Sequence, residues 1–174
     1  MEYGTEYGKR LAAELLGRPN AIARLYAEWR AGNLGHADLR DLLPQIWTRE
    51  STDSPEAVTG TAACVQFFRS AGFIAIPNDL EKPSGALTIY RGAPESHRIG
   101  MAWTQSETIA GHFRDGKRRR LGVEACVFQA SAGEDAVLAL FDDRREREVV
   151  IDPALITDVR RVLHPTGDGD ERQC

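Results

Sequence analysis

The fold class is decided in the second half of the chain, where residues 123–151 read VEACVFQASAGEDAVLALFDDRREREVVI. Within this stretch, residues 123–130, 136–141 and 148–151 are short runs rich in β-branched, aromatic and other apolar side chains. Glycine and charged residues separate the runs, as is typical of strands joined by turns. Similar runs occupy residues 87–90, 101–104 and 159–163. The sequence therefore predicts a mixed, mostly antiparallel sheet, interrupted by one helix from the N-cap Ser106 to about Arg114.

The first half of the chain has helical rather than strand periodicity. From Thr5 to about Gly72, apolar residues recur three or four positions apart. Four stripes predict four helices, and they contain Leu11, Leu15 and Leu16; Ile22, Leu25, Tyr26 and Trp29; Leu39, Leu42, Leu43, Ile46 and Trp47; and Val58, Ala62, Val65 and Phe68. We expect Pro44 to kink or break the third helix, and Ser54 with Pro55 to begin the fourth.

These patterns together predict an α+β protein in which N-terminal helices pack on the sheet. Because Trp29 and Trp47 lie on apolar stripes, we expect them to make that contact. The expected divisions are a helical region at residues 1–76, a β core at 77–166 that opens with a loop, and a flexible polar tail at 167–174.

Composition and charge disfavour several classes of function. Twenty-two basic against 26 acidic residues give a net charge of -4, whereas a protein that binds nucleic acid by its phosphates is normally basic. Three scattered cysteines and four scattered histidines form no metal-binding pattern, so we expect no metal site. The sequence has no apolar run long enough to span a membrane and no signal peptide, which predicts a soluble, cytoplasmic protein of its own or a target cell.

Three short segments carry residues suited to chemistry. The strand Ile89-Tyr90-Arg91-Gly92 ends in a guanidinium that can hold a phosphate and a glycine that allows close approach. The segment Trp103-Thr104-Gln105-Ser106 places two hydroxyls beside an aromatic ring. In Glu146-Arg147-Glu148 the two carboxylates are two positions apart, so on a strand they would project from the same face. Each has a plainer interpretation: a surface arginine, a core tryptophan with a helix cap, and a charged edge strand.

In order and spacing, the three segments resemble the R-S-E class of ADP-ribosyltransferases, the cholera-toxin-like group. That family carries an arginine on one strand, a Ser/Thr-containing strand next, and a Glu-x-Glu or Gln-x-Glu motif last. The resemblance covers about residues 86–162 and implies a sheet core of ADP-ribosyltransferase type. Ala102 stands where the family often has a first serine, which leaves open whether Thr104 or Ser106 is the working hydroxyl.

The resemblance implies a role for each matching residue. Arg91, beside Gly92, would hold the phosphates or the adjacent ribose of NAD. Thr104, with Ser106, would order the pocket and position the catalytic glutamate. Trp103 and Phe113 would form walls of the nicotinamide site. Glu148 would be the catalytic carboxylate that binds the ribose. Glu146 would act on an acceptor arginine, and residues 142–145 would face the target.

The implied activity is transfer of ADP-ribose from NAD, a consumed substrate, to an arginine of a target protein. Alternatives left open are a small-molecule or nucleic-acid acceptor, NAD hydrolysis by water, and a catalytically silent binding module on the same scaffold. The helical half would brace the sheet, recognise the target, or bind a partner that restrains the enzyme.

Overall fold

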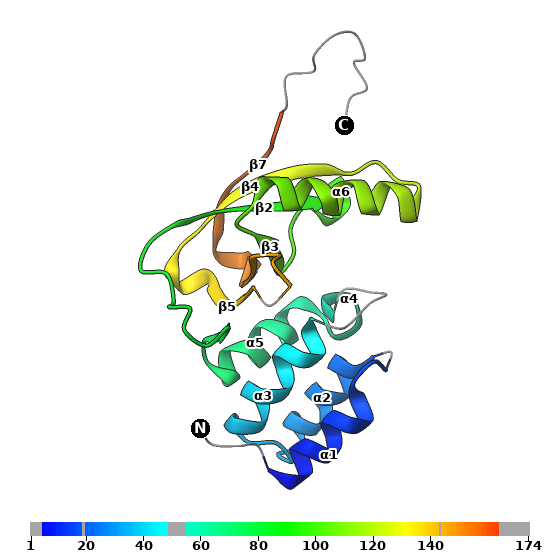
Figure 1. Ribbon diagram of the computed structural model, residues 1–174, viewed down its shortest axis with the longest axis vertical. Coiled ribbons are helices and arrows are strands. Elements are labelled where there is room, and N and C mark those ends of the chain that lie inside the picture. Colours follow the sequence, from blue (N-terminus) through cyan, green and yellow to red (C-terminus); the bar gives the residue numbers. More distant parts are fainter. Residues whose placement is uncertain (1–4, 19, 49–54, 143, 164–174) are drawn as a thin grey trace. The chain divides into compact units, whose positions relative to one another are not determined.

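The computed structural model describes residues 5–18, 20–48, 55–142 and 144–163 (Figure 1). The chain divides into two compact units, Met1–Asn78 and Asp79–Cys174. The mixture of helices and a sheet confirms the expected combination of α and β structure. Ser54 and the tail at 167–174 lie outside the described residues. Within those residues, no helix is both long and apolar enough to cross a bilayer.

The first unit is built from helices and ends in a short strand. Its elements are α1 (Glu6–Leu15), α2 (Ala21–Arg30), α3 (His36–Trp47), α4 (Pro55–Thr59), α5 (Thr61–Ala71) and β1 (Ile74–Ile76). Its core contains an aromatic cluster in which the Trp29 ring lies 5.4 Å from Phe67, and the Trp47 ring meets Phe68 edge to face at 4.9 Å. Both tryptophans thus have ring partners within their own unit. Their expected contact with the sheet stays a prediction.

Two helix boundaries in this unit differ from the sequence prediction. The expected break at Pro44 is absent, because α3 runs through this residue, and the expected kink stays a prediction. The predicted fourth helix is two helices, because Gly60 between them has a positive φ of 88, which interrupts the helical backbone. The strand β1 was not predicted, since three residues are too few for a clear alternation pattern.

The unit also buries one carboxylate, that of Asp38, which is 1% exposed. Asp38 accepts hydrogen bonds from the backbone amide and hydroxyl of Thr5 and from the amide of Gly35. These amides lie at the N-termini of α1 and α3, so the carboxylate satisfies donors that both helices would otherwise leave unpaired. Asp38 therefore has a structural role.

The second unit is an antiparallel sheet with one long helix. Its strands are β2 (Leu87–Ala93), β3 (Ala102–Thr104), β4 (Cys126–Ala132), β5 (Val137–Phe141), β6 (Glu148–Ile151) and β7 (Ile156–Arg161), with single turns of 3-10 helix at Glu95–His97, Glu134–Ala136 and Pro153–Leu155. They lie in the order β5-β6-β3-β2-β4-β7, and each neighbouring pair is antiparallel. These antiparallel pairs agree with the predicted mixed, mostly antiparallel sheet.

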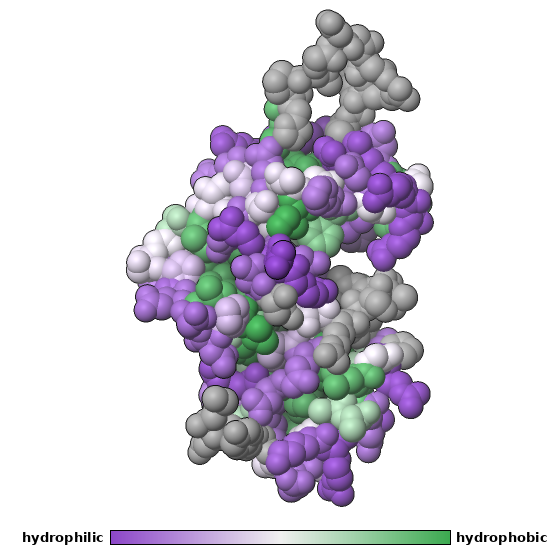
Figure 2. Space-filling view, in the orientation of Figure 1, coloured by the Kyte–Doolittle hydropathy of each residue, from purple (hydrophilic) through white to green (hydrophobic). Residues whose placement is uncertain are grey.

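The helix α6 (Glu107–Leu121) packs across β2 and also contacts β3 and β4. The Ser106 hydroxyl accepts a hydrogen bond from the amide of Ile109, which confirms the predicted N-cap. The helix extends well beyond Arg114 and ends at Gly122, which has φ 64. Its last turn carries Arg118, Arg119 and Arg120, and Figure 2 shows hydrophilic side chains gathered over this helix.

Candidate active site

The register of three adjacent strands brings the three predicted segments together. Tyr90 on β2 lies directly opposite Thr104 on β3, and Thr104 lies directly opposite Glu148 on β6. Directly opposed residues of an antiparallel pair project from the same face of the sheet. Arg91 follows Tyr90 on β2, so its side chain leaves the strand on the opposite face from Tyr90. The arginine, hydroxyl and glutamate of the candidate site thus come from neighbouring strands at the middle of this sheet.

The Arg91 guanidinium is held in place by backbone oxygens. Its Nε donates to the carbonyl of His97 at 3.0 Å, and its Nη1 donates to the carbonyl of Ala102. Gly100 leaves room for the group, because a Cβ there would lie only 2.8 Å from the Cζ of Arg91. These two carbonyl acceptors orient the guanidinium.

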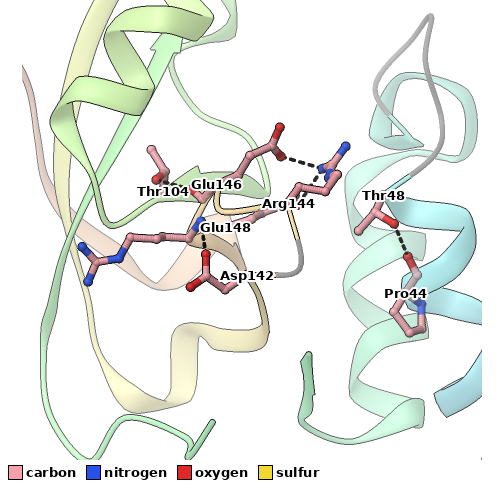
Figure 3. Close-up of polar contacts among 8 residues, drawn as sticks. Pro44, Thr48, Thr104, Asp142, Arg144, Glu146 and Glu148 are labelled. Atoms are coloured by element: carbon pink, nitrogen blue, oxygen red, sulfur yellow. Dashed lines mark hydrogen bonds and ion pairs between the residues drawn. The ribbon is translucent and has the colours of Figure 1, made fainter. Parts of the chain in front are cut away.

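Thr104 connects its strand to the turn that carries the glutamates. It is 3% exposed, and its hydroxyl donates to the carbonyl of Glu146 at 2.7 Å while accepting from the amide of Ser106 at 3.1 Å (Figure 3). The hydroxyl of Ser106 is occupied differently, since it caps α6. Of the two hydroxyls left open by the sequence, Thr104 is the one that contacts the Glu146 backbone.

Glu146 and Glu148 converge on one arginine, Arg144. Its Nη2 lies 2.7 Å from Oε2 of Glu146 and 3.5 Å from Oε2 of Glu148 (Figure 3). The side chains of Glu146 and Glu148 are 29% and 12% exposed, whereas that of Arg144 is 46% exposed. The two carboxylates therefore form a site that accommodates a guanidinium.

The expectation that a strand places both glutamates on one face is wrong. β6 begins at Glu148, and Arg147 before it has φ 48, which breaks the alternation of an extended chain. A turn brings Glu146 to the same place instead. Asp142 holds this turn, because its carboxylate accepts from the amide of Arg147 at 3.1 Å and its carbonyl accepts from the amide of Arg145 at 3.1 Å.

Three other residues of the expected site lie as follows. Trp103 is 2% exposed and its indole N–H donates to the carbonyl of Gly100 at 2.7 Å, so its ring packs in the interior. Gly92 is also buried, and a Cβ there would overlap backbone atoms of Ala110 and Arg114, so the group that approaches it closely is α6. Phe113 on α6 is 42% exposed and has a surface to offer a ligand.

Sequence reasoning placed Arg144 in the segment that faces the target but missed its ion pairs with the two glutamates, and it missed Gly100 altogether. The spacing of Arg144, Glu146 and Glu148, two positions apart each, was the available signal for the first. Nothing local marks Gly100, because its neighbour Arg91 lies on another element.

Comparisons with known proteins identify no relative of this chain. No family model, no curated protein and no solved structure matches this chain. The described residues contain no group of three or more His, Cys, Asp or Glu side chains placed to hold a metal ion.

Proposed function

We propose that this protein is an NAD-dependent mono-ADP-ribosyltransferase that transfers ADP-ribose to an arginine side chain. The observation that supports this most strongly is the register in which Tyr90, Thr104 and Glu148 are direct neighbours across three strands. Three segments separated in the sequence thereby bring a fixed guanidinium, a hydroxyl and a pair of carboxylates to adjacent strands.

Glu148 is the catalytic residue of this proposal. Breaking the bond between nicotinamide and ribose develops positive charge on the sugar, and a preorganised carboxylate stabilises that charge. Glu148 suits the role because its backbone is fixed in the sheet opposite Thr104, and its side chain is only 12% exposed. A largely desolvated carboxylate interacts more strongly with a nearby positive charge than one surrounded by water.

Arg91 binds the diphosphate or the adjacent ribose of NAD. Its orientation by the carbonyls of His97 and Ala102 means that little side-chain entropy is lost when a phosphate binds. Thr104 acts indirectly, because its bond to the Glu146 carbonyl fixes the turn before Glu148.

Glu146 acts on the acceptor. Its carboxylate holds the guanidinium of Arg144 at 2.7 Å, which supports an arginine as the acceptor. An incoming guanidinium is protonated near neutral pH, and a second carboxylate stabilises it beside the reacting sugar. Water, a small molecule and a nucleic acid are the competing acceptors.

The test is to incubate the full chain with NAD and to measure nicotinamide release and ADP-ribose transfer to a peptide containing arginine. Glu148→Gln should lower both by roughly 100- to 1000-fold, because both reactions pass through the same sugar cation. Glu134→Gln is the matched control, since this carboxylate is exposed at the opposite end of β5. Thermal melts of all variants establish that they are folded before rates are compared.

Glu146→Gln separates transfer from hydrolysis. If Glu146 serves only the acceptor, the variant should lose transfer to arginine and retain some nicotinamide release. Nicotinamide release with no transfer by the unmodified protein would identify an NAD glycohydrolase. No release and no NAD binding by the folded protein would leave a binding module and would contradict the proposal.

A further inference from the structure

The arginine that bridges the two glutamates belongs to the same turn as they do. Arg144 lies two positions before Glu146 and four before Glu148, and its Nη2 contacts both carboxylates. The turn is fixed at both ends, by Asp142 on one side and by the bond from Thr104 to the Glu146 carbonyl on the other. The guanidinium of Arg144 is therefore presented to the carboxylate pair by the backbone of its own chain.

We propose that Arg144 is a self-modification site, where the protein attaches ADP-ribose to its own guanidinium. This inference rests on the proposed function. The Nη2 of Arg144 lies closer to the carboxylate of Glu146 than to that of Glu148. This difference fits the proposed roles, because Glu146 acts on the acceptor and Glu148 must contact the ribose. With 46% of its side chain exposed, Arg144 has room to receive a bulky group.

The reaction balances without any further reactant. A nitrogen of the Arg144 guanidinium forms a bond to C1′ of the nicotinamide ribose. The bond from C1′ to the nicotinamide nitrogen breaks, and its electron pair leaves with nicotinamide. The attacking nitrogen loses a proton to the carboxylate of Glu146 and then to solvent, while the modified guanidinium retains its positive charge. Holding the acceptor beside the reacting carbon gives an intramolecular reaction a large kinetic advantage over attack by a separate peptide.

Two neighbouring arginines provide internal controls. Arg145 is exposed and has φ 57, and Arg147 directs its guanidinium to Oε1 of Gln105 at 3.4 Å. Among these three arginines of the described turn, Arg144 is the one whose guanidinium forms ion pairs with Glu146 and Glu148. The inference therefore singles out one arginine among three within four residues.

The experiment is to incubate the full chain with NAD, digest it, and map the attached ADP-ribose by fragmentation mass spectrometry. ADP-ribose is expected on Arg144, and the fraction of modified chains at a given time should not change on dilution, because the reaction occurs within one molecule. Arg144→Lys should reduce the modification of this peptide to background, and the label should not move to Arg145 or Arg147. Arg145→Lys, the matched control within the same turn, should leave the label on Arg144 in place.

Each outcome decides between the two proposals. Nicotinamide release with ADP-ribose only in solution or on another residue would overturn the self-modification site and leave the proposed function standing. Modification of Arg144 that slows in proportion to dilution would show attack by a second molecule and would also overturn it. Absence of nicotinamide release from folded protein would contradict both proposals.

Discussion

At the residue scale, the orientation of Arg91 depends on the absence of a side chain at Gly100. A Cβ at this position would lie 2.8 Å from the Cζ of Arg91, so Gly100→Ala should displace the guanidinium without removing a charge. We expect weaker NAD binding and slower nicotinamide release, measured by calorimetry and by rate. Gly133→Ala is the control, because no atom lies within 4 Å of its added Cβ. Equal NAD affinity in both variants would show that Arg91 does not hold the phosphates.

Thr104 gives a second prediction at this scale. Thr104→Val keeps the shape but leaves the Glu146 carbonyl and the Ser106 amide without their partner, which should cost about 1–3 kcal/mol of stability. Thr104→Ser keeps both hydrogen bonds and loses one methyl group, at a cost of about 1 kcal/mol. Nicotinamide release, measured well below both melting temperatures, should fall further in the valine variant. Equal rates would mean that the hydroxyl does not position the turn.

At the scale of elements, the packing of α6 on β2 requires Gly92. Because a Cβ would overlap backbone atoms of Ala110 and Arg114, Gly92→Ala should lower the free energy of unfolding by roughly 1–3 kcal/mol. Gly116 lies on the same helix, and a Cβ added there would have no atom within 4 Å. Gly116→Ala should therefore raise the free energy of unfolding by about 0.5–1 kcal/mol. Denaturant unfolding measures both changes. A neutral effect of Gly92→Ala would contradict the close approach of helix and strand.

The contact between Tyr7 on α1 and Glu28 on α2 predicts that the stability of the helical unit depends on pH. The Glu28 carboxylate accepts hydrogen bonds from the side-chain Nδ2 of Asn33 and from the Tyr7 hydroxyl, each at 2.7 Å, and these bonds lower the pKa of its carboxyl. A lowered folded-state pKa contributes stability above the unfolded-state pKa, and this contribution is lost as the pH falls through the folded value. Asn33→Ala should raise the pKa of Glu28 toward its ordinary value. The variant should therefore lose less stability than the unmodified protein when the pH is lowered. NMR titration of Glu28 measures the shift, and an unchanged pKa would contradict the assignment.

At the scale of the whole molecule, the helical unit has its own aromatic core. The rings of Trp29 and Trp47 pack on Phe67 and Phe68 of α5, within residues 1–78. We therefore predict that residues 1–78 produced alone are helical and unfold cooperatively, with tryptophan signals in the near-ultraviolet circular dichroism spectrum. A chain of this length can bury enough apolar surface to fold by itself. A gradual, non-cooperative melt without these signals would contradict the prediction.

The sequence predicted most of the elements because their signals are local. The apolar stripes of α1, α2 and α3 follow the helical repeat, and the runs at β2, β5 and β6 are bounded by turn residues. Ser106 was identifiable as a cap because an N-cap acts on an amide three residues away. The sequence also pointed to Arg91, Thr104, Glu146 and Glu148 as candidate residues, although their chemistry stays a prediction.

The tertiary structure decided which of these residues are neighbours. The order of strands depends on hydrogen bonds between distant segments, so no local pattern specifies that Thr104 lies between Tyr90 and Glu148. For the same reason, the close approach of α6 to Gly92 could not be predicted from the sequence. The left-handed conformation of Arg147 is unfavourable for a residue with a Cβ, so the turn that joins Glu146, Glu148 and Arg144 also depends on contacts made by Asp142 and Thr104. Local side-chain pattern thus determined the elements, and long-range hydrogen bonding and packing determined the site.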